Sequence, residues 1–196
     1  MPIPAFTIDG VLPPYVGATG PGGAAQDMTP YVATAVEVVT TFGTSGVRRD
    51  LLSKWLDHRA AFRALGFAQG FQWIDGSFVE DKVPQDIDVV SFSRRPVNIA
   101  GPAALQALMR ANPEQCIRAN VKLRYNLDAF FVDLDGTKEG LVNATRYYLG
   151  LFSHRRADGL WKGMVEVRFD NPADDTAAVV ALAALAQSAA TGGATP

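Results

Sequence analysis

The sequence predicts an α+β protein with a small mixed β-sheet that is covered by helices. Segments with apolar residues at three- and four-residue spacing, the helical period, alternate along the chain with short apolar runs that are typical of strands. The chain has 196 residues, of which 48% are hydrophobic and 10% aromatic, as in folded globular proteins. This length suits one well-buried core and is short for two. We therefore expect one core.

The first 30 residues are predicted to form an irregular arm. They contain six prolines and five glycines between short apolar patches, a composition that opposes regular structure. Thr29 and Pro30 then show the pattern of an N-cap followed by a first helical residue. They predict a helix from Pro30 to about Thr41, which Gly43 ends.

The next segment has a clear helical pattern. Ser45 is a suitable N-cap, and Gly66 ends the segment. Between them the large apolar side chains form one stripe at three- and four-residue spacing, namely Leu51, Leu52, Trp55, Leu56, Phe62 and Leu65. We expect an amphipathic helix with this stripe toward the core.

Strands and helices alternate through the centre of the chain. The strands are short apolar runs bounded by turn residues, and each helix has a proline in its first turn. The predicted strands are 71–74, 86–92 and 127–134, and the predicted helices are 101–111 and 113–120.

The C-terminal part is predicted to contain two helices and one strand. A helix over 138–152 is followed by a strand over 162–169, in which apolar residues alternate with other residues. Pro172 signals the last helix. Asp174 and Asp175 fall in its first turn, where the helix dipole favours anions.

These elements give a simple domain organisation. Residues 1–30 are the arm, residues 31–190 are expected to form a single domain, and residues 191–196 are expected to fray. The longest strongly apolar stretch, 177–186, is about half as long as a bilayer span requires. We therefore expect no contact with a membrane.

Charge and cysteine content exclude some classes of protein. The net charge is −2, and no lysine or arginine precedes Arg48, so a broad basic surface for nucleic acid is not expected. The single cysteine, Cys116, excludes an internal disulfide and fits a reducing compartment. The first residues resemble neither a signal peptide nor a transit peptide. Together these features predict a cytoplasmic protein.

The segment Asp86-Ile87-Asp88-Val89 is the most informative motif. Side chains two residues apart on a strand point to the same face, roughly 6.5 to 7 Å apart. Two such carboxylates can hold Mg²⁺, which takes its other ligands from water and substrate phosphates. Gly76 and Ser77 lie shortly upstream, where a turn without a Cβ lets backbone N–H groups approach phosphate. The pattern indicates phosphate chemistry.

This arrangement resembles the nucleotidyltransferase superfamily, the fold of DNA polymerase β and of minimal nucleotidyltransferases. The shared features are a helix, a strand with a Gly-Ser turn, an Asp-x-Asp strand and a later strand with a further Asp, over roughly residues 45–135. The stretches 71–92, 121–134 and 162–167 also resemble a small family of uncharacterised bacterial nucleotidyltransferase-like proteins.

The resemblance implies roles for individual residues. Gly76 and Ser77 would hold the triphosphate of an NTP substrate, and Asp86, Asp88 and Asp128 would bind Mg²⁺ or Mn²⁺ and form the catalytic centre. Two metal ions in such a site activate the attacking hydroxyl and stabilise the leaving pyrophosphate. The predicted activity is the transfer of a nucleoside monophosphate to a hydroxyl on a protein, an RNA or a small molecule. The acceptor and the oligomeric state stay open.

Basic residues near these motifs are candidates for phosphate contacts. Lys82 lies between the Gly-Ser turn and the Asp-x-Asp strand, and Lys122 leads into the strand that bears Asp128. A cation near the leaving group stabilises its developing charge. The further candidates are Arg124, Arg155, Arg156 and Lys162.

Two residues are candidates for the third metal-binding carboxylate. Asp128 and Asp133 lie five residues apart on one predicted strand, so they face opposite sides of it. We favour Asp128, because it begins the strand and precedes the apolar run 129–132. Asp133 stays the alternative.

Two other functions compete with this one. The stretch 130–137 resembles the nucleophile motif of haloacid-dehalogenase phosphatases, in which Asp133 would attack phosphorus and Asp135 would act as acid and base. That fold usually needs a longer α/β core than the 59 residues that follow the motif. The other alternative is a non-catalytic module that binds a nucleotide or a partner, such as a component of a toxin–antitoxin pair.

Overall fold

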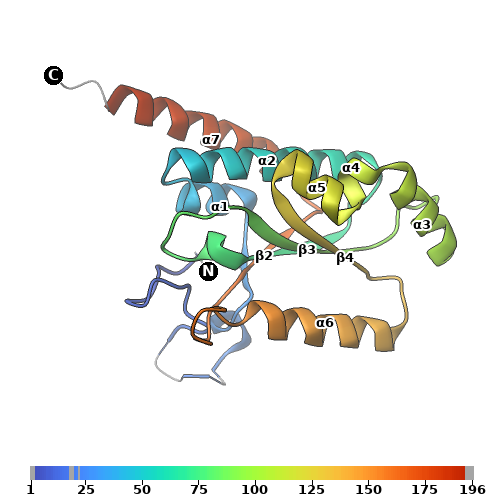
Figure 1. The fold of residues 1–196 in the computed structure, drawn as a ribbon, viewed down its shortest axis with the longest axis horizontal. Coiled ribbons are helices and arrows are strands. Elements are labelled where there is room, and N and C mark those ends of the chain that lie inside the picture. The colour runs from blue at the N-terminus through green and yellow to red at the C-terminus, as the bar shows by residue number, and fades with distance from the viewer. Residues whose placement is uncertain (1–2, 18–19, 22, 193–196) are drawn as a thin grey trace.

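The computed structural model describes residues 3–17, 20–21 and 23–192. The predicted fraying of the C-terminus concerns mainly residues 193–196, which lie outside the described residues, as do residues 1–2, 18–19 and 22 of the predicted arm. The described chain forms a mixed α and β fold, shown in Figure 1. The predicted α+β class is therefore confirmed.

Helices and strands are interspersed along the chain. The α-helices are α1 (Ala35–Phe42), α2 (Gly46–Ala64), α3 (Gly101–Ala111), α4 (Pro113–Cys116), α5 (Arg118–Tyr125), α6 (Lys138–Phe152) and α7 (Pro172–Gly192). The strands are β1 (Tyr31–Ala33), β2 (Gly70–Asp75), β3 (Ile87–Ser93), β4 (Leu127–Asp133) and β5 (Val165–Arg168). Two 3₁₀ turns are η1 (Ala25–Asp27) and η2 (Gly76–Val79).

Within the described residues, the strands form one mixed sheet of five strands in the order β1-β5-β2-β3-β4. Strand β2 runs antiparallel to both of its neighbours, β3 and β5, whereas β1 pairs with β5 and β4 pairs with β3 in parallel. The two outer pairs are thus parallel and the centre is antiparallel. The prediction of a small mixed sheet is correct.

Helices cover both faces of the sheet (Figure 1). On one face α1, α2, α5 and α7 surround the main core, in which Leu52 and Val121 pack with Val89 and Val165 of the sheet. On the other face α6 closes a second core around Trp73, Val90 and Phe92. Because the sheet is covered on both sides, its strands are largely apolar on both faces.

The first predicted helix begins too early. The predicted cap Thr29 precedes a short strand, β1, whose Tyr31 lies opposite Val165 of β5. The helix α1 begins only at Ala35, where Thr34 and Glu37 form a capping box. In that box the side chain of each residue accepts a hydrogen bond from the backbone N–H of the other.

Other predicted helices agree closely with the structure. Ser45 is the N-cap of α2, as predicted, and α3 and α6 have the predicted bounds. The predicted helix 113–120 is divided instead into α4 and α5, because Ile117 between them has an extended backbone. The last strand is shorter than predicted, since β5 begins only at Val165.

The described part of the N-terminal arm pairs with the segment that follows η2, where Val11 forms an antiparallel bridge with Glu80. Leu12 is fully buried in the main core. Its carbonyl accepts a hydrogen bond from Gly163 N at 2.8 Å, and Gly10 O accepts one from Asp81 N at 2.8 Å. The arm therefore joins the segment after β2 to the segment before β5.

Buried charges connect α2 to α7. Arg59 of α2 is 0% exposed, and its guanidinium donates to both carboxylate oxygens of Asp175 and to Gln72 Oε1. The same group lies 5.0 Å from the ring centre of Trp55 and 4.9 Å from that of Phe169. This network fixes the start of α7 on the core.

The two aspartates at the start of α7 have partners that the sequence did not predict. They lie in the first turn, as predicted, but Asp174 accepts hydrogen bonds from Ala35 N and Val36 N at the start of α1. Asp175 binds Arg59 and Arg63 of α2.

Among the described helices, none is both long enough and apolar enough to cross a bilayer.

Candidate functional site

Three aspartates from three neighbouring strands form a row at one end of the sheet. Asp75 of β2 lies directly opposite Asp88 of β3, and Asp88 lies directly opposite Asp128 of β4. Side chains alternate between faces along a strand, and opposite residues share a face. Val90 and Phe130, each two residues further along, belong to the core beneath α6. The row therefore points to the face that α6 covers.

A cavity of about 540 Å³ lies beside this row. It is bounded by the ends of the strands, by η2 and by the segment after α6, which includes His154 and Arg156. Six of the seven residues predicted for the site line this cavity, namely Asp86, Asp88, Asp128, Gly76, Ser77 and Lys82. The structure thus brings the Asp-x-Asp motif, the Gly-Ser turn and the later aspartate together.

Gly76 lies in direct contact with Asp88. Its φ of +73° falls in the left-handed region, and a Cβ at this position would lie only 1.7 Å from Asp88 Oδ2. Glycine is the residue that accepts such a φ without strain and has no Cβ to collide. The close contact fixes the Gly-Ser turn against the central carboxylate.

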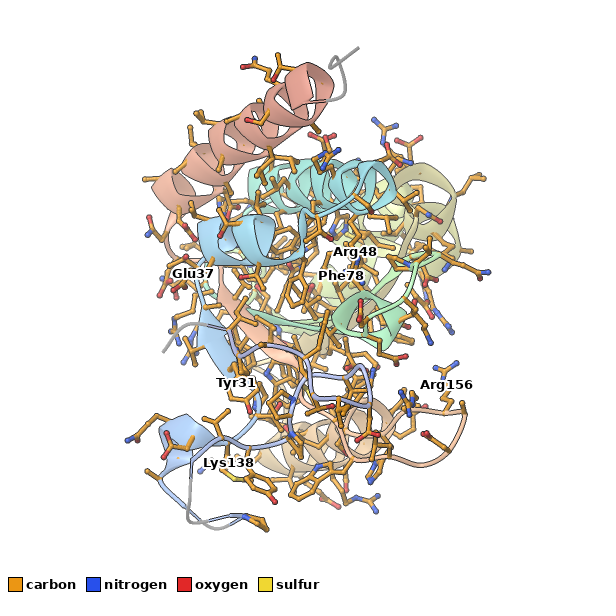
Figure 2. The ribbon with its side chains drawn as sticks, turned by 90° about the vertical axis from the view of Figure 1, so that its left-hand side faces the viewer. Tyr31, Glu37, Arg48, Phe78, Lys138 and Arg156 are labelled. Carbon is orange, nitrogen blue, oxygen red and sulfur yellow. The ribbon has the colours of Figure 1, made fainter. Side chains whose placement is uncertain are left out.

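Arg48 of α2 holds the loop that connects the Gly-Ser turn to β3. It donates to Phe78 O at 2.7 Å, to Glu80 O at 2.5 Å and to Lys82 O at 3.0 Å. Figure 2 shows Arg48 beside Phe78, whose ring centre is 5.2 Å from the guanidinium carbon. Three carbonyls are thereby fixed by one planar group, and the loop that bears Lys82 is held on the core.

A buried lysine lies behind the turn. Lys162 is only 2% exposed, and its Nζ donates to Gly76 O at 2.8 Å and to Glu80 Oε1 at 3.2 Å. It also forms an ion pair with Asp75 Oδ1 at 3.1 Å. Since an ammonium group compensates buried carboxylates, Lys162 links the acidic row to the backbone of the turn.

Two basic side chains of α5 bind two of the predicted metal ligands. Lys122, the seventh predicted residue, forms an ion pair with Asp86. Arg118 donates from Nε and Nη2 to the two carboxylate oxygens of Asp128. Lys122 is therefore connected to the cavity through the carboxylate of Asp86.

Residues 4–168 match the sequence pattern of a protein family that is described as a family of unknown function, DUF6932. The chain belongs to this family. No curated protein and no solved structure matches the chain. The matched segment includes every residue of the row and of the cavity and ends with β5, so α7 lies beyond it.

The donor set of the cavity suits a hard divalent cation. Within residues 3–17, 20–21 and 23–192, no group of three or more His, Cys, Asp or Glu side chains is positioned to hold a metal ion. The acids nevertheless lie side by side, and carboxylate oxygens are the ligands that Mg²⁺ and Mn²⁺ prefer. Burial, and then repulsion by Asp128, raise the pKa of Asp88. A cation beside Asp88 would oppose both effects.

The electrostatics differ along the row. Hydrogen bonds from Arg118 hold the pKa of Asp128 below its usual value. Burial raises the pKa of Asp75 to about 7, although Lys162 opposes that shift. In addition, Asp75 Oδ1 is buried, and its polar partner is the Lys162 ammonium at 3.1 Å.

Asp133 and Asp135 lie at the other end of β4. Asp133 accepts two hydrogen bonds from Arg95, and Asp135 accepts one from Arg94 and one from the Arg95 backbone. Asp133 lines a separate cavity of about 290 Å³ at the start of α6. The structure therefore does not bring these two residues to the acidic row.

No sequence motif predicted a role for Asp75 or Arg118. Asp75 follows Phe71 and Trp73 at two-residue spacing, so a strand extended by one residue would have placed its carboxylate on their face. Arg118 is one helical turn before Lys122, which is a usable signal once α5 is known.

Replacing Gly76 by alanine should destabilise the protein by about 1–3 kcal/mol, because the new Cβ and the left-handed backbone both add strain. It should also displace Asp88. Urea unfolding measures the first effect. Gly46→Ala is the matched control, since a Cβ there meets nothing within 4 Å. Equal stability of the two variants would contradict the contact between Gly76 and Asp88.

The stability of the metal-free protein should depend on pH through Asp75. Its folded pKa of about 7 exceeds the value of about 4 for an unfolded aspartate. Between these values the folded state keeps a proton that the unfolded state has lost, so stability falls as pH rises from about 4 to about 7 and is level above that. Urea unfolding at several pH values in EDTA measures this, and Asp75→Asn should remove the decline. An unchanged pH profile in Asp75→Asn would contradict the assignment.

Proposed function

We propose that this protein is a divalent-metal-dependent nucleotidyltransferase, which transfers a nucleoside monophosphate from an NTP to a hydroxyl group. The observation that carries the proposal is the row of Asp75, Asp88 and Asp128 on three adjacent strands, with Gly76 in contact with the central carboxylate. In this reaction the acceptor oxygen bonds to the α-phosphorus and the bond to the bridging oxygen breaks. Pyrophosphate leaves, and the hydroxyl proton passes to solvent.

The acidic and the basic residues of the cavity have different proposed roles. Asp86, Asp88 and Asp128 would supply oxygen ligands to Mg²⁺ or Mn²⁺. When bound, these ions supply charge neutralisation on phosphate and a lowered pKa of the acceptor hydroxyl. Gly76 and Ser77 would orient the triphosphate, since both line the cavity and backbone N–H groups of such turns bind phosphate.

Cations that line the same cavity support the proposal. Lys82, Arg155 and Arg156 line the cavity. Figure 2 shows Arg156 on the segment after α6, and Asp88 and Asp128 both lie within its electrostatic influence. A volume of about 540 Å³ falls in the range of roughly 300–1,000 Å³ that is typical of small-molecule sites. An NTP is a substrate of suitable size and charge.

The test is incubation of the protein with Mg²⁺, a cell lysate and each of the four NTPs labelled at the α-phosphate. Transfer of label to a macromolecule or a small molecule, with release of pyrophosphate, is the expected result. Binding of an NTP without any labelled product would favour a non-catalytic binding module, such as a toxin–antitoxin component. Hydrolysis of a phosphate monoester that is lost only in Asp133→Asn would favour the phosphatase. Absence of NTP binding in Mg²⁺ would refute the proposal.

A further inference from the structure

Helix α5 presents a pair of basic side chains to two of the candidate metal ligands. Arg118 and Lys122 are four residues apart, so they lie on one face of the helix. Each is paired with a different candidate metal ligand, Arg118 with Asp128 and Lys122 with Asp86. The third candidate ligand, Asp88, has no ion pair among the described residues, and Gly76 covers one side of it.

We propose that Arg118 and Lys122 are exchangeable counter-ions that bind the polyphosphate of the substrate. In the metal-free protein they neutralise Asp128 and Asp86. When divalent cations and a polyphosphate enter, the carboxylates turn to the cations and the two basic groups donate instead to phosphate oxygens. The inference rests on the proposed function and adds Arg118 to the residues that contact the substrate.

The exposure of the two ion pairs makes this exchange feasible. The side chain of Arg118 is 60% exposed and that of Lys122 is 42% exposed. Ion pairs near solvent contribute little to stability, because water screens them and long side chains lose entropy in them. Two singly charged groups would thus yield readily to divalent ions. The buried pair of Lys162 and Asp75, 2% and 4% exposed, lacks this freedom.

Charge balance explains why the released groups would bind phosphate. Each base that leaves a carboxylate would otherwise stand unpaired beside a divalent cation, which repels it. A polyphosphate supplies the missing negative charge, and an arginine fork matches two phosphate oxygens. Arg118 is also held near the site when it moves, since its guanidinium carbon lies 4.5 Å from the ring centre of Phe130. Metal ions and polyphosphate should therefore bind cooperatively.

Two titrations of the full chain test the inference. The first measures Mn²⁺ alone by the electron paramagnetic resonance signal of the free ion. The second measures inorganic tripolyphosphate in Mg²⁺ by calorimetry, a probe that does not depend on the base of the nucleotide. Arg118→Gln and Lys122→Gln should each bind Mn²⁺ roughly two- to fivefold more tightly, because a competing exposed ion pair is gone. They should bind tripolyphosphate about tenfold more weakly, because a charge-assisted hydrogen bond is lost.

Arg124→Gln is the matched control. It makes the same change of charge on the same helix, but its partner Glu114 does not line the cavity, whereas the partners of Arg118 and Lys122 do. It should leave both affinities within about twofold of the wild-type values, as expected for a screened surface charge.

The opposite direction of the two effects is the diagnostic result. If the two basic residues have a purely structural role, both variants should bind Mn²⁺ and tripolyphosphate more weakly. If only the overall charge matters, Arg124→Gln should change the affinities in the same way. Either result would overturn the inference. Unchanged affinities in Arg118→Gln and Lys122→Gln, with normal binding by the wild type, would overturn it and leave the proposed function standing. If the wild type binds neither Mn²⁺ nor tripolyphosphate, both fail together.

Discussion

Replacing Asp88 by asparagine should lower the rate of nucleotidyl transfer by about a thousandfold. Asp88 is the central member of the acidic row, with Asp75 on one neighbouring strand and Asp128 on the other. Asparagine keeps the size of the side chain but removes its charge, so a divalent ion loses an anionic ligand. The stabilisation that such ions give to a transition state is several kcal/mol, which corresponds to about three orders of magnitude in rate. Release of pyrophosphate in Mg²⁺ is the measurement.

Asp133→Asn is the informative comparison for Asp88→Asn. Asp133 is an aspartate of the same sheet, but it lies at the other end of β4 in an ion pair with Arg95. It should keep transfer activity within a few-fold of the wild type, once thermal unfolding shows that both variants are folded. A rate for Asp88→Asn that is close to the wild-type rate would exclude Asp88 from the catalytic centre. Loss of activity in Asp133→Asn alone would direct attention to the phosphatase alternative.

Replacing Arg59 by methionine should lower the free energy of unfolding by about 3–5 kcal/mol. This is the usual cost of removing one partner of a buried ion pair, because the other partner is left buried without its counter-ion. Arg59 is 0% exposed and donates to Asp175, Gln72 Oε1 and the Arg168 carbonyl. Methionine fills most of the space but donates no hydrogen bond. Urea unfolding monitored by circular dichroism measures the change.

Lys54→Met provides the control on the same helix. Lys54 pairs with Asp50 at 2.7 Å, but its side chain is 37% exposed, and an exposed pair contributes up to about 1 kcal/mol. The double variant Arg59→Met, Asp175→Leu should recover part of the loss, because it leaves no buried carboxylate behind. Equal unfolding free energies for Arg59→Met and Lys54→Met would contradict the importance of the buried network.

Local patterns predicted most of the helices and failed where a distant partner decides the structure. Ser45 caps α2 as predicted because its side chain accepts a hydrogen bond from Arg48 N, three residues away. By contrast, Thr29 and Pro30 have a helical start pattern, yet Tyr31 belongs to a strand that pairs with β5, more than 130 residues later. The capping box of Thr34 and Glu37 was present in the sequence and would have given the correct start.

The local motifs of the candidate site could be predicted from the sequence, but their spatial partners could not. The Asp-x-Asp spacing and the Gly-Ser turn are local features, and the structure places both on one cavity. The position of Asp128 opposite Asp88 depends on the parallel register of β3 and β4, which no local pattern determines. The ion pairs of Arg118 and Lys122 likewise depend on how α5 packs on the sheet.

The parallel pairing of β3 and β4 has a mechanical consequence for any ligand. Asp88 and Asp128 are anchored to adjacent hydrogen-bonded strands, so the separation of their backbones is set by a sheet spacing of about 4.8 Å. Arg155 and Arg156 instead belong to an irregular segment between α6 and β5. The separation of the two carboxylates is thus set by backbone hydrogen bonds between strands, whereas the position of Arg155 is set by side-chain contacts, such as its ion pair with Asp158.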